Sequence, residues 1–157
     1  MIKKLSEAQK AWLAGFIDGE GYVGIVFQTK KETRKSSATP RYHPFIVIAN
    51  NDLEVLRYIQ KIIGEGRVNL VRDVRGNCNR TYQYRLSKSV ALLHTLECLF
   101  PYLKIKNRQC DILTKFLQRR ALIKPITGRG HRGTTSFNEV DYSLYKRLAA
   151  LNKRGVV

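Results

Sequence analysis

Two acidic residues, Asp18 and Glu20, lie in a glycine-rich stretch at the end of a predicted helix. The helix dipole is negative at that end, so each carboxylate is disfavoured there by roughly 0.3–1 kcal/mol. A bound cation would offset this cost, because carboxylate oxygens are good ligands for hard cations. A buried amphipathic helix that ends in a glycine-rich turn explains the same physical features equally well.

The helix that must position these acids is predicted to begin after Ser6, which forms a capping-box pattern with Gln9. Small residues recur every four positions along it, at Ala11, Gly15 and Gly19, and so line one stripe with almost no side chain. Glycine inside a helix costs about 1 kcal/mol relative to alanine. Close approach of a second helix along this stripe would account for two of them.

The stretch from Leu13 to Gly21, LAGFIDGEG, resembles the LAGLIDADG signature of homing endonucleases. The resemblance implies an α+β fold of the order αββαββα, in which helices back a saddle-shaped antiparallel sheet. It also implies a homodimer, because the motif occurs once and a two-strand cut needs two active sites, and the small-residue stripe of the helix is the expected dimer interface. Glu20, where the family usually has Asp, is implied as a catalytic metal ligand, and the Gly19 carbonyl as a second metal contact. The implied cofactor is Mg²⁺, roughly two or three ions per pair of active sites.

Three further stretches extend the resemblance. Residues 101–106, PYLKIK, resemble the family's PFLKLK segment, which makes Lys104 the basic residue that supports the water network at the metal site. Residues 48–52 resemble the end of the family's second strand, where Asn50 matches a polar position that orients the attacking water. The last helix, residues 137–152, is similar to that of single-motif enzymes of the algal-chloroplast type. The alternative interpretation of Lys104 is an ordinary lysine at the start of a helix, and that of Asn50 is a turn residue at the end of a strand.

Alternation of apolar and polar residues predicts two pairs of strands, 22–30 with 41–50 and 66–75 with 79–87. Each pair has an apolar face and a partly polar, basic face, as a β-ribbon needs to enter a groove of DNA. We expect these residues on the polar faces to bind DNA: Gln28, Lys30, Arg41, His43, Gln83 and Arg85. In the third strand Val68 and Leu70 are expected to be buried and Arg67 and Asn69 to be exposed, whereas the phase beyond Leu70 is undecided.

Helical periodicity predicts further helices at about 53–63, 89–100, 105–123 and 137–151, with a flexible basic connection at 125–136. Asp52 is expected to cap the first of these and Gly64 to end it. Ser87 or Ser89 is expected to cap the next one, and Ser136 the last.

The chain has 29 Lys and Arg against 12 Asp and Glu, a formal net charge of +17. So large an excess of one sign indicates a polyanionic partner, most commonly nucleic acid.

The length of the chain favours one domain, residues 1–157. Because it has neither an 18-residue apolar run nor a signal peptide, no membrane contact is expected. Its three cysteines lack CxxC spacing, which argues against a zinc site or a disulfide framework.

Together these features predict a site-specific, Mg²⁺-dependent endonuclease that acts as a homodimer on a long pseudo-palindromic site in double-stranded DNA. An RNA maturase that assists splicing, with intron RNA as its partner, is an alternative, since some members of the family have that role. A DNA-binding regulator that has lost cleavage is another, although Glu20 and Lys104 argue against it. Such a protein is expected inside the cell, in a prokaryotic cytoplasm or in an organelle that contains DNA.

Overall fold

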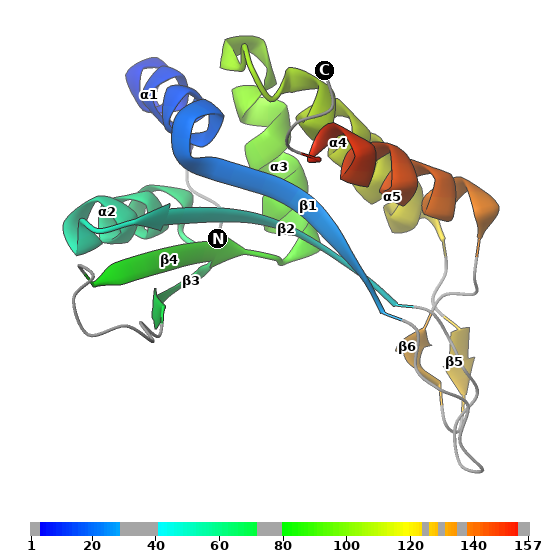
Figure 1. Cartoon of the computed structure of the whole chain (residues 1–157). Coiled ribbons are helices and arrows are strands. Elements are labelled where there is room, and N and C mark those ends of the chain that lie inside the picture. Colours follow the sequence, from blue (N-terminus) through cyan, green and yellow to red (C-terminus); the bar gives the residue numbers. More distant parts are fainter. Residues whose placement is uncertain are drawn as a thin grey trace.

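The computed structural model describes residues 4–28, 41–71, 80–123, 126–128, 131–134 and 138–153. The elements are, in chain order, α1 (Glu7–Glu20), β1 (Gly21–Gln28), β2 (Arg41–Asn50), α2 (Leu53–Ile63), β3 (Arg67–Val71), β4 (Thr81–Leu86), α3 (Ser89–Leu99), η1 (Phe100–Tyr102), α4 (Asn107–Leu122), β5 (Ile126–Gly128), β6 (His131–Thr134) and α5 (Glu139–Leu151). The predicted order αββαββα is confirmed in the part from α1 to α3 (Figure 1). No helix in the described residues is both long and apolar enough to cross a membrane.

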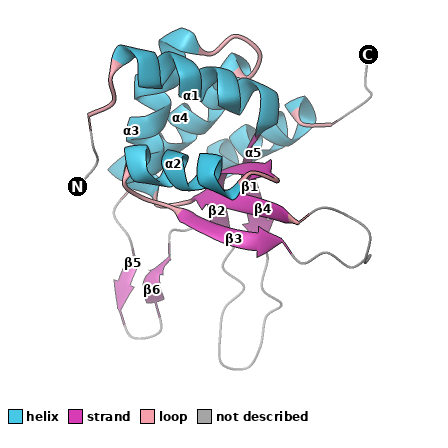
Figure 2. Ribbon diagram, turned by 90° about the vertical axis from the view of Figure 1, so that its left-hand side faces the viewer, coloured by secondary structure: helices cyan, strands magenta, loops and turns pink. Residues whose placement is uncertain are grey.

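The strands β1 to β4 form one antiparallel sheet in the order β1-β2-β4-β3. The helices lie together on one face of this sheet and leave its other face uncovered (Figure 2). We call the first the covered face and the second the open face. Gly21 pairs with Ile48, and Ile46 pairs with Leu86. Residues that pair across neighbouring strands lie on the same face of the sheet, so this register decides which residues share each face.

The covered face carries the sheet's share of the hydrophobic core. Val23, Ile46, Tyr84 and Leu86 are buried on it, against helical residues such as Leu92. Burying a large apolar side chain contributes roughly 1.5–3 kcal/mol, so this register fixes which polar residues face outward.

Local signals place the first two helices as predicted. The Ser6 hydroxyl accepts a hydrogen bond from the Gln9 backbone N–H at 3.2 Å, and the Gln9 side chain accepts one from the Ser6 N–H at 3.0 Å. The Asp52 carboxylate caps α2, and Gly64 ends it with a φ of 76°, in the left-handed region that favours glycine. These caps confirm the capping box and both ends of α2.

Three details differ from the sequence predictions. The N-cap of α3 is Lys88, with no side-chain cap bond, and that of α5 is Asn138, whose Oδ1 accepts from the Val140 N–H at 2.8 Å. Neither Ser87 nor Ser89 caps α3, and Ser136 lies outside the described residues. Leu70 is on the covered face but is 58% exposed, because β3 is the edge strand.

The basic connection between α4 and α5 contains the short strands β5 and β6, which pair antiparallel. The sequence predicts only a loop for this connection, because strands of three and four residues are too short to show alternation. This pair of strands projects away from the helical layer (Figures 1 and 2).

Candidate active site and DNA-binding face

The end of α1 is held by Asp18, which is 8% exposed. Its carboxylate accepts hydrogen bonds from the backbone N–H groups of Lys104 (2.7 Å), Ile105 (3.2 Å) and Lys106 (2.9 Å), immediately before α4. Burial acts to raise the pKa of Asp18, but these three bonds outweigh it and lower the pKa below its ordinary value. The Lys106 ammonium also donates to the backbone carbonyl of Asp18. We call Asp18 and residues 104–106 the Asp18 clamp.

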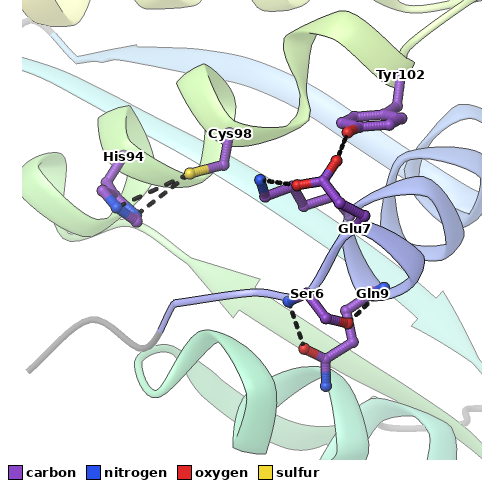
Figure 3. A network of polar contacts seen from close by, with 7 residues as sticks. Ser6, Glu7, Gln9, His94, Cys98 and Tyr102 are labelled. Atoms are coloured by element: carbon purple, nitrogen blue, oxygen red, sulfur yellow. Dashed lines mark hydrogen bonds and ion pairs between the residues drawn. The ribbon is translucent and has the colours of Figure 1, made fainter.

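The start of α1 is anchored by a second set of polar contacts (Figure 3). The Tyr102 hydroxyl donates to the Glu7 carboxylate, which also accepts from the Lys10 ammonium at 2.6 Å. Tyr102 precedes the Asp18 clamp by two residues. The segment between α3 and α4 therefore holds α1 at both ends and fixes where its last turn lies.

Glu20 and Gly19 form the last turn of α1, and both are exposed. The Glu20 carboxylate has no hydrogen-bond or ion-pair partner among the described residues, in contrast to Asp18 two positions earlier. A carboxylate and a backbone carbonyl are hard oxygen donors, which suits magnesium. The donor set therefore fits the cation that the motif implies.

Lys104 and Asn50 lie at the same end of α1 as Glu20. The backbone of Lys104 belongs to the Asp18 clamp, and its side chain is exposed. Asn50 ends β2, two residues beyond the residue that pairs with Gly21. Its Oδ1 accepts from the Asp52 N–H at 2.8 Å, which is the strand-end turn that the alternative interpretation expected.

The predicted small-residue stripe faces outward. Ala11, Gly15 and Gly19 are all exposed, and a Cβ built on either glycine meets no described atom of another element within 4 Å. The described part of the chain therefore gives no packing reason for a glycine at these two positions. A second body outside the chain would supply one.

The predicted DNA-binding residues that the structure describes share the open face. Gln28 pairs with Arg41, and both are exposed, as is His43 two residues further along β2. Gln83 and Arg85 are half-buried on β4 and lie on the same face. Arg67 and Asn69 of β3, which are exposed as predicted, are the pairing partners of Arg85 and Gln83 and lie on this face too. Lys30 lies outside the described residues.

Sequence reasoning missed two contributors to these sites. Lys106 binds the end of α1, yet nothing in the PYLKIK string distinguishes it from Lys104. Phe45 is 7% exposed although it lies on the open face, because Tyr22 and Arg85 cover its ring. The signal for it was the pair of apolar residues, Phe45 and Val47, that interrupts the polar face after Arg41 and His43.

A family model matches two thirds of this chain, and several solved structures share its fold. The family model described as LAGLIDADG endonuclease matches residues 13–118. The homing endonuclease I-CvuI, crystallised with a DNA target and Mg, has a TM-score of 0.66 at 20% identity, over 96% of this chain and 87% of that chain. The archaeal intron-encoded homing endonuclease I-Vdi141I, complexed with DNA, has a TM-score of 0.71 at 20% identity over the same shares.

The homing endonuclease I-TnaI has a TM-score of 0.61 at 20% identity, over 96% of this chain and 97% of that chain. A search of curated protein sequences returned no match. Structural likeness at this identity shows the fold, whereas the family match spans the motif, the sheet and most of α4. The chain therefore belongs to the LAGLIDADG endonuclease family.

Proposed function

We propose that this chain is a homodimeric, Mg²⁺-dependent endonuclease that cuts double-stranded DNA at a long pseudo-palindromic site. The observation that carries the proposal is the environment of Glu20. It is an exposed carboxylate at the end of the family motif, without a partner in the described part of the chain. An acid left unpaired at the negative end of a helix is costly unless a cation binds there.

The glycines of α1 support assembly of two copies. Neither Gly15 nor Gly19 is required by packing within the described chain, and each costs about 1 kcal/mol of helix stability relative to alanine. A second copy of α1 laid against this stripe would bring two Glu20 carboxylates near a two-fold axis. A dimer of this kind matches a pseudo-palindromic site, in which each half-site faces one subunit.

Magnesium would be held by the Glu20 carboxylate and the Gly19 carbonyl. No three His, Cys, Asp or Glu side chains of the described residues lie close enough together to hold a metal ion. Phosphate oxygens, water and the second copy would therefore complete the ligand set, as is usual for Mg²⁺. When bound, the metal lowers the pKa of water and neutralises charge on the phosphate.

The remaining site residues act on water and charge. The exposed ammonium of Lys104 stabilises negative charge on the scissile phosphate, and the Asp18 clamp keeps Lys104 beside the end of α1. The side-chain oxygen of Asn50 accepts a hydrogen bond from the Asp52 N–H. The side-chain NH2 group of Asn50 is therefore the part that can hold a water molecule. The open face of the sheet reads the bases, and the net charge of +17 attracts the phosphates.

Replacing Glu20 by Gln tests the proposal. Duplexes selected from a random library would be incubated with the wild type, Glu20→Gln and the control Glu139→Gln, an exposed acid on α5. We expect Glu20→Gln to bind in Ca²⁺ like the wild type and to lose cleavage in Mg²⁺, whereas the control cleaves normally. Normal cleavage by Glu20→Gln would remove the assigned ligand, and a wild type that binds but never cuts would be a regulator.

A further inference from the structure

Three side chains on neighbouring strands form a stack on the open face. The Arg85 guanidinium carbon of β4 lies 4.2 Å from the centroid of the Phe45 ring on β2. The Tyr22 ring of β1 also stacks on Phe45, with centroids 5.8 Å apart and an interplanar angle of 28°. A cation over an aromatic face at this distance is an attractive contact that fixes the orientation of the guanidinium.

The Phe45 ring is a fixed platform for Arg85. It is 7% exposed, and it leans over Gly24, its pairing partner on β1. A Cβ at Gly24 would come within 3.1 Å of Phe45 and 2.7 Å of Tyr22, so the two rings occupy the space that a side chain would need. Arg85 therefore presents its planar set of N–H donors from a supported position, which lowers the entropy lost on binding.

Among the described residues, the Arg85 guanidinium has no hydrogen-bond or ion-pair partner. Arg67 is its pairing partner on β3, and like charges directly opposite each other destabilise a sheet. The nearby Glu65 carboxylate is already paired with Lys88 at 2.8 Å. A hollow of about 490 Å³ opens here and is lined by Glu65, Gly66, Arg67, Asn69, Arg85, Ser87 and Lys88. An electron-rich ligand in this hollow would offset the repulsion between the two arginines.

We propose that Arg85 and Arg67 form a subsite that reads the acceptor edge of a guanine, and that Phe45 is the positioning residue for Arg85. The inference rests on the proposed function, because it requires DNA on the open face. Guanine presents two acceptors, O6 and N7, in the major groove, and a planar guanidinium donates to both at once. A ring that holds this guanidinium in one orientation sharpens the choice of base, and a homodimer repeats the choice at two symmetry-related positions.

Selection of bound sequences from a randomised duplex library, in Ca²⁺ and with the full chain, tests the subsite. We expect Arg85→Ala to lower guanine preference at one position per half-site by about tenfold or more. Phe45→Leu should lower it at the same position by about threefold to tenfold, and Phe45→Tyr, which keeps the ring, should restore it. The control Val47→Ala, at the residue that pairs with Arg85 and Tyr22, removes apolar packing but keeps the Phe45 ring, and it should leave that preference in place.

The double variant Phe45→Leu/Arg85→Ala distinguishes positioning from general loosening. If Phe45 acts through Arg85, the double variant loses no more preference than Arg85→Ala alone. Losses that add, or that spread evenly over all positions as for a phosphate contact, would overturn the subsite and leave the endonuclease proposal intact. Failure of the wild type to enrich any duplex would overturn both.

Discussion

The Asp18 clamp predicts a large and pH-dependent loss of stability when its carboxylate is removed. In Asp18→Ala, three backbone N–H groups that now donate at 2.7, 3.2 and 2.9 Å lose their acceptor. Hydrogen bonds to a charged group contribute about 1.5–3 kcal/mol each, but these three share one carboxylate and water can replace part of the set. We therefore expect the free energy of unfolding to fall by about 3 kcal/mol at pH 7.

The pH dependence follows from the lowered pKa of Asp18. Because the folded-state pKa lies below the ordinary value of 3.8, the stabilisation is fully present above that value. It is lost as the pH falls through the folded-state pKa, when the carboxyl group becomes protonated in the folded protein too. The difference between the wild type and Asp18→Ala should thus be constant from pH 6 to 8 and shrink below about pH 4.

Urea unfolding followed by circular dichroism at pH 7 and at pH 3 measures both effects. The matched control is Asp111→Asn on α4, whose carboxylate makes an exposed ion pair with Lys115 at 2.7 Å. Such pairs contribute little, so the control should lose less than about 0.5 kcal/mol. A loss for Asp18→Ala no larger than that of the control, or one that persists unchanged at pH 3, would refute the clamp.

Three further predictions concern other parts of the fold. Gly15→Leu should keep the circular dichroism spectrum of the wild type, because no described atom lies within reach of the new Cβ. The variant should nevertheless sediment as a monomer and lose cleavage. A variant that remains dimeric would exclude this stripe as the interface. Asp141 is fully buried and pairs with Arg119 (2.9 Å) and Arg120 (3.2 Å). Asp141→Ala should lower the free energy of unfolding in urea by about 3 kcal/mol, and a near-neutral result would show that water replaces the carboxylate. Burial raises the pKa of Cys110 to about 12, so mass spectrometry after alkylation at pH 8 should find it unmodified until the protein unfolds.

Features governed by neighbours in the sequence were predictable. The capping box at Ser6 and the caps of α2 at Asp52 and Gly64 require only residues within one turn of each other. The alternation in β1 and β4 likewise identified the open face, since a shift of one residue would expose every apolar side chain. The open-face placement of Gln28 and Gln83 followed from that alternation alone.

Features set by tertiary packing were not predictable from the same signals. Helix α3 begins after Lys88 without a side-chain cap bond, because its buried residues, such as Leu92 and Leu96, hold it against the core. Leu70 has the correct phase and still lies exposed, because alternation assigns a face but does not show where the helical cover ends. The cation–π contact of Arg85 joins residues 40 positions apart, which no local pattern encodes.

The two acids at the end of α1 show why the cation argument applies to one residue only. Both carry the cost of a carboxylate at the negative end of a helix. For Asp18 the fold itself meets that cost, because backbone N–H groups of residues 104–106, immediately before α4, donate to it. Glu20 receives no such contact from the described residues, although it lies only two positions away. The clamp thus fixes the last turn of α1 and Lys104 together, and the acid that it leaves unpaired is the one available to a metal ion.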